Sequence, residues 1–377
     1  MLPLDPKISI CLRTTAVALA LLLAVLAGPA SAQTPSPALL VLEKNDNMLA
    51  IVDPSTFKIV GRVPSGPDPH EIEASADGKL AYISNYGGLD SSFNTISVVD
   101  VAAQKALPPI QLGALHFTHG LWFTGGKLYF TAETNKVIGR YDPASHTVDW
   151  ILGTGQDRTH MVEVSKNLDR IFTSNVNSAT ISIIEQVSPP AGGFGPPPGA
   201  APGSGPPAGP PPQGPGGPGG QPRLTWEITN VPAGKGVEGF DISPDGKEIW
   251  AANARDATVT IIDVATKKAI QTLPIPVKGA NRLKFTPDGN RVLISGLGAR
   301  AGDSSLVVID ASTRKEVKQL NLGGGAAGIL IAVDGARAYV AVSMADKVAV
   351  VDLKTLEVVG QIDAGKQPDG LAWATQK

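Results

Sequence analysis

A short apolar run that ends in an acidic residue recurs seven times along the 377-residue chain, and this repeat constrains the fold more than any other feature. Successive acidic residues lie 42 to 47 positions apart, except for one gap of 78 that contains a 35-residue stretch rich in proline and glycine. Without that stretch the gap shortens to 43. This length is typical of one four-stranded blade of a β-propeller. The seven acidic residues are Asp53, Asp100, Asp142, Glu185, Asp263, Asp310 and Asp352.

Each repeat also contains the strands and turns that such a blade needs. In the second repeat, a strand at Glu71–Ser75 leads through the Asp77-Gly78 turn into a second strand at Leu80–Ser84. A third strand, Thr95–Val99, follows after a polar loop. Aspartate and glycine favour the positive φ of a tight hairpin turn, so turn formation explains these pairs better than calcium binding does. The pair recurs at Asp245-Gly246, Asp288-Gly289 and Asp334-Gly335.

The two ends of the repeat region complement each other. Pro368–Trp373 looks like the first strand of a further blade, but the chain stops soon afterwards. The first repeat begins with a second strand, Leu39–Leu42, and has no first strand ahead of it. Pairing these two segments would close a ring and remove an exposed sheet edge. We therefore predict an all-β fold, a seven-bladed β-propeller of four-stranded blades, closed by pairing the C-terminal strand with the N-terminal strands.

The best-formed repeats resemble a known family. Tyr82-Ile83-Ser84-Asn85 followed by Asn94–Asp100, together with Ser-Pro-Asp-Gly-Lys at 243–247, is similar to the YVTN β-propeller repeat of the WD40/YVTN repeat-like superfamily. The resemblance implies a seven-bladed exported or surface protein, and most members have no assigned activity. Related propellers carry redox centres. Glu133 and Val342 depart from the pattern, because asparagine would be usual where they stand.

Residues 1–32 have the pattern of an export signal. Lys7 and Arg13 precede an unbroken apolar run over residues 16–27, and Ala30-Ser31-Ala32 supplies small residues for cleavage. As a helix, this run would span about 18 Å, short of the ~30 Å core of a bilayer. We therefore predict a cleaved signal peptide and a single propeller domain over residues 33–377. The protein is expected to be exported, periplasmic or extracellular, with no membrane anchor in the mature chain.

The proline- and glycine-rich stretch covers residues 188–222, where 26 of 35 residues are proline or glycine. It has almost no apolar side chains to bury, so we predict a disordered insert within one blade, between that blade's third and fourth strands. A surface loop of this length is tolerated at little energetic cost. The alternative is a docking tract for the aromatic groove of a partner protein.

The charge balance and the motif content exclude several classes of function. The formal net charge is −2, without the basic excess of a nucleic-acid-binding protein. The chain has no G-x-S-x-G elbow, no P-loop, no H-E-x-x-H and no cysteine pair for zinc or haem. We therefore expect no nucleic-acid partner, and a monomer that binds an unidentified protein or small ligand.

Histidines gather at one equivalent position of the repeat. Aligning the repeats on their turns places one residue at the start of each first strand, and in a propeller these strands line the central channel. Three of the seven residues are histidine and two are acidic, a donor set that suits zinc, copper or iron. The alternative is an imidazole that only hydrogen-bonds a neighbouring blade. The ring consists of Asp369, His70, His119, His160, Glu238, Asn281 and Ala327. The candidate metal ligands are His70, His119, His160, Glu238 and Asp369.

Two hypotheses of function follow from these features. The first is an exported propeller that acts as a binding or interaction scaffold through its channel mouth and loops, with no catalytic or cofactor-binding residue assigned. The second is a metal-binding or redox-associated enzyme with a His-rich site at the channel mouth. Hydrolytic or lyase chemistry at the same ring and a structural role in the cell envelope rank below these. Arg158 and Lys278, near the same mouth, could receive an anion.

Overall fold

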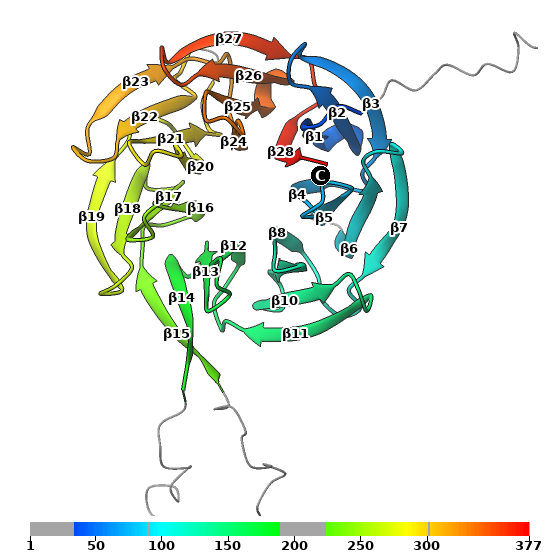
Figure 1. Ribbon diagram of the computed structural model, residues 1–377. Coiled ribbons are helices and arrows are strands. Elements are labelled where there is room, and N and C mark those ends of the chain that lie inside the picture. Colours follow the sequence, from blue (N-terminus) through cyan, green and yellow to red (C-terminus); the bar gives the residue numbers. More distant parts are fainter. Residues whose placement is uncertain (1–33, 89–90, 189–223, 301, 377) are drawn as a thin grey trace, which may run out of the picture.

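The computed structural model describes residues 34–88, 91–188, 224–300 and 302–376. Within them the chain forms 28 strands in seven sheets of four. The sheets surround a central channel as blades, each with its first strand innermost (Figure 1). The predicted seven-bladed all-β propeller is therefore confirmed. The predicted signal peptide, and all of the predicted insert except Ser188, lie outside the described residues.

We number the blades from the one that joins the two ends of the chain. Blade 1 consists of β28 (Pro368–Ala374), β1 (Ala38–Glu43), β2 (Met48–Asp53) and β3 (Lys58–Pro64). Blade 2 consists of β4 (Pro69–Ala74), β5 (Leu80–Gly88), β6 (Ser91–Asp100) and β7 (Lys105–Gln111). Blade 3 consists of β8 (Thr118–Thr124), β9 (Lys127–Ala132), β10 (Val137–Asp142) and β11 (Thr147–Gly153). Blade 4 consists of β12 (Thr159–Val164), β13 (Arg170–Asn175), β14 (Thr180–Val187) and β15 (Thr225–Pro232).

The remaining three blades have the same order from the channel outward. Blade 5 consists of β16 (Val237–Ile242), β17 (Glu248–Asn253), β18 (Thr258–Asp263) and β19 (Lys268–Pro274). Blade 6 consists of β20 (Ala280–Phe285), β21 (Arg291–Gly296), β22 (Leu306–Asp310) and β23 (Glu316–Leu320). Blade 7 consists of β24 (Ile329–Ile331), β25 (Arg337–Val342), β26 (Lys347–Asp352) and β27 (Glu357–Ile362).

Helix is almost absent from the described ranges. It is confined there to two single 3-10 turns, Lys44–Asp46 and Ser343–Ala345. No helix in this part of the chain combines the length and apolar character that crossing a bilayer requires. Both turns follow the second strand of their blade, and both contribute residues to the pocket described below.

The aspartates of the repeat close its turns. In blade 2, Asp77 Oδ1 accepts hydrogen bonds from the Ser75 hydroxyl at 2.7 Å and from the Lys79 N–H at 3.1 Å. Gly78 between them has a φ of 68°, which glycine adopts without a steric penalty. Asp245 is held in the same way, and the hydrogen bonds of its turn lower its pKa to about 2. Turn formation accounts for these aspartates, as the sequence predicted.

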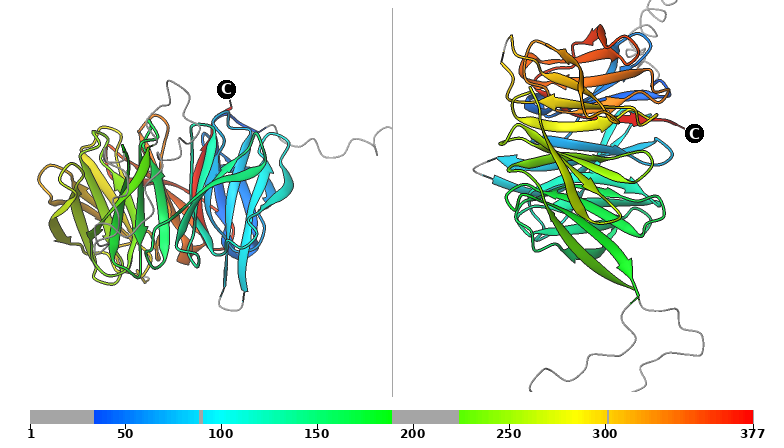
Figure 2. Two further views of the ribbon diagram at one scale, coloured as in Figure 1. Left: turned by 90° about the horizontal axis from the view of Figure 1, so that it is seen from below. Right: turned by 90° about the vertical axis from the view of Figure 1, so that its left-hand side faces the viewer.

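The ring closes where the two ends of the chain meet. β28 pairs antiparallel with β1, from Ala38 opposite Ala374 to Val41 opposite Leu371. The predicted closure is therefore confirmed. The disc is seen from its edge in Figure 2, where the β14–β15 hairpin extends past the rim. The segment 189–223 connects these two strands, the third and fourth of blade 4.

The hydrophobic core is divided among the interfaces between blades. The described residues form seven apolar clusters, and each draws its members mainly from two adjacent blades. Trp250, Tyr339 and Phe130 are the largest fully buried side chains among them. Because both faces of a blade are covered, its two middle strands are buried almost continuously instead of alternating, as in β1 and β18.

Six of the seven inner strands enter the channel through the same kind of bend. The residue two positions before the ring residue has a left-handed φ in six blades, and in four of them it is not glycine. In most blades a β-bulge follows, and in blade 2 it lies between Pro69 and Ile72. A bulge re-aims the side chains beside it, so that two adjacent residues can face the channel. The four non-glycine residues with positive φ are Asp68, Phe117, Arg158 and Gln367.

Candidate functional site

The seven ring residues surround one pocket at a mouth of the channel. Its cavity volume is about 250 Å³, and all five candidate ligand residues line it together with Asn281 and Ala327. The structure therefore brings the sequence-predicted residues together. Loops and 3-10 turns contribute the further lining residues Lys44, Arg158, Leu297, Ser343, Met344 and Gln367. Tyr86 reaches the pocket from β5 and Arg282 from β20.

The three histidines form a row along blades 2 to 4. The rings of His70 and His119 are 5.1 Å apart, and those of His119 and His160 are 3.7 Å apart, measured between centroids. Tyr86 packs edge-on against His119 at 5.1 Å. Burial, with the nearby His160 and His70, holds the pKa of His119 well below its ordinary value. His119 is therefore neutral at pH 7, and its buried Nδ1 has no hydrogen-bond partner in the part of the chain that the structure describes.

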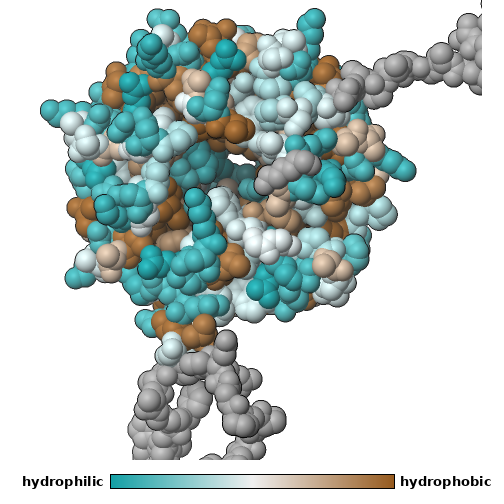
Figure 3. Space-filling view, in the orientation of Figure 1, coloured by the Kyte–Doolittle hydropathy of each residue, from teal (hydrophilic) through white to brown (hydrophobic). Residues whose placement is uncertain are grey.

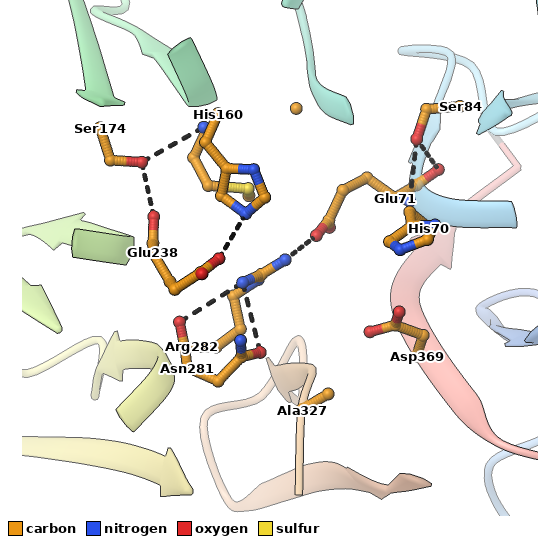
Figure 4. A network of polar contacts seen from close by, with 12 residues as sticks. His70, Glu71, Ser84, His160, Ser174, Glu238, Asn281, Arg282, Ala327 and Asp369 are labelled. Carbon is orange, nitrogen blue, oxygen red and sulfur yellow. Dashed lines mark hydrogen bonds and ion pairs between the residues drawn. The ribbon is translucent and has the colours of Figure 1, made fainter. Parts of the chain in front are cut away.

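Two carboxylates hold the histidine of blade 4 from both sides. His160 Nδ1 lies 2.5 Å from Glu133 Oε1. His160 Nε2 lies 2.8 Å from Glu238 Oε2 (Figure 4). Burial by itself lowers the pKa of His160, but the two carboxylates outweigh it and raise the pKa above the ordinary value. Burial likewise raises the pKa of Glu238, and His160 and Arg158 outweigh it, which leaves that pKa at about 2. His160 and Glu238 therefore form a charged pair.

The histidine of blade 2 has the opposite environment. Lys44 Nζ lies 2.6 Å from His70 Nε2, and His70 Nδ1 lies 3.3 Å from the carbonyl oxygen of Asp68. Burial and the ammonium of Lys44 lower the pKa of His70 to about 4. His70 is thus neutral at pH 7, with Nε2 accepting a hydrogen bond from the Lys44 ammonium and Nδ1 donating one to the backbone. The same ammonium lies 3.8 Å from Asp369 Oδ2.

An ion pair crosses the channel beside the pocket. Arg282 of β20 donates to Glu71 Oε1 of β4 at 2.5 Å, and these strands stand on opposite sides of the ring (Figure 1, Figure 4). Each residue directly follows a ring residue on its strand. The side chains are only 12% and 17% exposed, so the pair is largely shielded from solvent. It ties together two blades that are not neighbours.

A second polar cluster lies further along the same inner strands. Lys284 Nζ donates to Asp241 Oδ1 at 2.8 Å. Burial lowers the pKa of Lys284, but Asp241 and Glu163 outweigh it and raise the pKa. Burial raises the pKa of Glu73 and that of Glu163 to about 8 each. The channel is thus polar beyond the pocket as well. The ring is hollowed at its centre on the face drawn in Figure 3, and hydrophilic surface borders the hollow.

Hydroxyl side chains fix the backbone of the ring from the neighbouring blade. Ser174 Oγ accepts the N–H of Met161 in its own blade at 3.2 Å and donates to the carbonyl oxygen of Glu238 in the next blade at 2.5 Å (Figure 4). Thr131 makes the same pair of bonds to Gly120 N–H and to the carbonyl oxygen of His160. The second strand of one blade thereby positions the ring residue of the next.

This bridging hydroxyl leads to a prediction with a matched control. Ser174→Ala leaves one N–H and one carbonyl oxygen without partners and is expected to lower the free energy of unfolding by roughly 1–3 kcal/mol. Ala252 occupies the same position in blade 5, so Ala252→Ser is expected to cost much less or to stabilise. Urea denaturation of both variants measures the difference. Equal stability of wild type and Ser174→Ala would show that the bridge is dispensable.

The pocket has two unlike walls. The ionic wall, formed by blades 1 to 5, consists of Lys44, His70, His119, Arg158, His160, Glu238 and Asp369. The apolar wall consists of Leu297, Ala327 and Met344 of blades 6 and 7, and the same blades also line the pocket with three polar residues, Asn281, Arg282 and Ser343. Ala327 stands where other blades place long polar side chains, and Figure 4 shows how little of the ring it fills.

Several residues of this site differ from what the sequence suggested. The sequence does not single out Lys44, Tyr86 and Arg282, which line the pocket. Lys278 does not line it and instead forms an exposed ion pair with Asp303. The prediction that Glu133 stands where Asn85 stands in blade 2 is wrong. Thr118 pairs with Ala132 as Pro69 pairs with Asn85, so Ala132 holds that position. Glu133 comes one residue later, where it reaches His160.

The metal-ligand hypothesis meets a geometric obstacle. Among residues 34–88, 91–188, 224–300 and 302–376, no three or more His, Cys, Asp or Glu side chains are arranged to hold a metal ion. The ring nitrogens of His70 and His160 already face Lys44, a backbone carbonyl and two carboxylates. Two buried histidine nitrogens among the described residues have no hydrogen-bond partner, His119 Nδ1 and His160 Nε2. The carboxylate of Glu238 lies 2.8 Å from His160 Nε2, so His119 Nδ1 is the one of the two that no carboxylate approaches.

Comparison with known proteins identifies the fold and no family. No protein-family model and no curated protein sequence matches the chain. A functionally unknown protein from Desulfotomaculum acetoxidans is similar with a TM-score of 0.67 and 12% identity, over 91% of this chain and 100% of that one. Hydrazine synthase from Kuenenia stuttgartiensis gives 0.61 and 16%, over 82% and 90%. The dihydro-heme d1 dehydrogenase NirN, in complex with DHE, gives 0.58 and 15%, over 93% and 78%.

Proposed function

We propose that this propeller is a binding protein that takes up a small amphipathic molecule in its channel-mouth pocket. The observation that carries the proposal is the division of one pocket into an ionic wall and an apolar wall. A cavity of about 250 Å³ is somewhat smaller than the ~300–1,000 Å³ of pockets for drug-sized ligands. The ligand is therefore a small molecule with a polar end and an apolar end.

The pocket is pre-formed in a way that favours binding. Six of the seven ring residues stand on strands, and hydroxyls of adjacent blades fix the backbone of ring residues such as His160 and Glu238. A rigid site loses little conformational entropy when the ligand enters. Two polar groups beside the cavity can still bind a ligand. They are Nδ1 of His119, which has no hydrogen-bond partner among the described residues, and the carboxylate of Asp369.

A screen with two pocket variants and one control variant outside the pocket tests this function. Small amphipathic molecules of each charge type are tested by thermal shift, and the hits are measured by calorimetry. Leu297→Glu puts a charge on the apolar wall at a 40% exposed position and is expected to weaken binding at least tenfold, whereas Val333→Glu, at a 66% exposed position outside the pocket, is expected to leave it unchanged. Ala327→Phe is expected to fill the cavity and give the same loss.

Two results would contradict the binding function. One is the failure of every compound to bind, or hits whose affinity neither pocket variant changes. The other is stoichiometric metal in protein purified without a His tag and lost in His119→Ala, which would establish the metal-dependent or redox-associated alternative. The observation that favours that alternative is the row of three imidazoles, whose successive ring centroids are 5.1 and 3.7 Å apart.

We further propose the finer assignments that the sequence suggested. The Tyr82–Asn85 motif and its equivalents support membership of the YVTN repeat family. The pattern of residues 1–32 supports export to the periplasm or the extracellular space, with the mature protein acting as a monomer. Electrophoretic size and N-terminal sequencing of the protein from an exporting host test the cleavage.

A further inference from the structure

Asp369 contributes a carboxylate to the pocket that has few hydrogen-bonding or ionic partners within the described residues. Its carboxylate lines the cavity, its side chain is 14% exposed, and within the described residues it accepts no hydrogen bond. The nearest cation is Lys44, whose ammonium is 3.8 Å away and also 3.9 Å from Asp68. Burial raises the pKa of Asp369, and Lys44 and Arg282 offset this in part. A cationic group of a ligand would complete this environment.

The neighbours of Asp369 do not repel such a cation. His70 and His119 are the next two ring residues, and both are neutral at pH 7 for the reasons given above. The charged groups on this side are two cations, Lys44 and Arg282, and three carboxylates, from Asp68, Asp369 and Glu71, of which Glu71 pairs with Arg282. This side of the mouth carries an excess of negative charge that suits an ammonium ion.

Arg158 offers hydrogen-bond donors on the other side of the mouth. Its Nε donates to Glu133 Oε2 at 3.3 Å, and its NH1 atom lies 3.6 Å from Glu238 Oε1. A guanidinium has five N–H donors in a planar fork, so these contacts occupy only part of it. The side chain is 30% exposed and lines the cavity. A carboxylate is the group that such a fork binds best.

The carboxylate of Asp369, the guanidinium of Arg158 and the apolar wall together specify one class of ligand. We propose that the pocket binds amino acids with a short apolar side chain, with the ammonium group at Asp369, the carboxylate at Arg158 and the side chain against Leu297, Ala327 and Met344. The proposal rests on the proposed binding function and narrows it to zwitterions. It needs no metal and no movement of the blades.

Four related compounds separate the contributions of the two charges. L-Leucine carries both charged groups, isocaproate lacks the ammonium, isoamylamine lacks the carboxylate, and isocaproamide carries neither charge. Calorimetry at pH 7 is expected to show that leucine binds most tightly. Each single deletion is expected to weaken binding roughly 10- to 100-fold, the effect of one charge-assisted hydrogen bond.

Asp369→Asn tests the assignment of the ammonium to one residue. It is expected to weaken leucine binding at least tenfold and to leave isocaproate binding unchanged. The matched control is Asp363→Asn, an exposed aspartate six positions away that does not line the pocket. Circular dichroism of both variants verifies folding, and the conservative Asp369→Glu variant is expected to restore part of the affinity.

The outcomes distinguish this proposal from the function on which it rests. If isocaproate or isoamylamine binds as tightly as leucine, or if Asp369→Asn leaves leucine binding unchanged, the ligand class is wrong while the binding function stands. The same holds if only other amphipathic molecules bind and Leu297→Glu removes their binding. If no small molecule binds at all, both proposals are overturned.

Discussion

Deletion of residues 368–377 is expected to abolish cooperative folding or to lower the free energy of unfolding by about 5 kcal/mol or more. The deletion removes β28, the innermost strand of blade 1, and leaves the edge of β1 unpaired. It also removes Leu371 and Trp373 from one apolar cluster and Ala372 and Ala374 from another. Near-ultraviolet circular dichroism and urea denaturation measure the loss.

Two controls separate the role of the strand from that of its position in the sequence. Removal of residues 376 and 377 alone spares β28 and is expected to cost less than ~1 kcal/mol. A circular permutant that links Gln376 to Thr34 and begins in the β3–β4 loop keeps every strand. A short linker can join the two ends, because Ser36 Oγ and the Gln376 carbonyl oxygen are only 3.2 Å apart. The permutant is expected to fold. If the variant without residues 368–377 were as stable as the wild type, the ring would not depend on this closure.

Loss of one partner from the ion pair across the channel is expected to be the next most damaging change. Arg282→Met leaves Glu71 as a buried carboxylate with no opposite charge in hydrogen-bond contact, at a cost of roughly 3–5 kcal/mol. The double variant Arg282→Met, Glu71→Met removes both charges and is expected to recover most of that loss. Urea denaturation of the two single variants and the double variant gives the coupling energy.

The matched control is an ion pair of the same chemistry at the surface. Arg170 and Glu185 lie 3.1 Å apart within blade 4, with side chains 44% and 20% exposed. Arg170→Met is expected to cost less than ~1 kcal/mol, because solvent screens exposed pairs. Equal losses at the two sites would mean that burial and position across the channel add nothing to the Arg282–Glu71 pair.

The fold and the ring residues were predictable because both follow from local repetition. The apolar run, the Asp-Gly turn and the terminal aspartate each act within a few residues, as the hydrogen bonds of Asp77 show. Once the repeats are aligned, residues at one register position must lie at one height in the channel. His70, His119, His160, Glu238 and Asp369 therefore line one pocket.

The rest of the pocket could not be predicted because it depends on irregular backbone. Lys44 comes from a 3-10 turn and Tyr86 from the end of a long strand, although each directly follows the residue that pairs with the start of its blade's first strand. Arg282 follows a ring residue directly, where simple strand alternation would point it away from the channel. Position along the chain also does not reveal that Glu71 and Arg282, 211 residues apart, meet across the channel.

The closure of the ring by β28 also sets the order in which the molecule can form. Blades 2 to 7 are each continuous in sequence and can take shape as soon as their own four strands have been synthesised. Blade 1 has to wait, because its inner strand is made about three hundred residues after β1. Contacts of such large sequence separation form slowly. During synthesis, β1 therefore presents a bare apolar edge that a chaperone can hold, and the arrival of β28 ends that exposure.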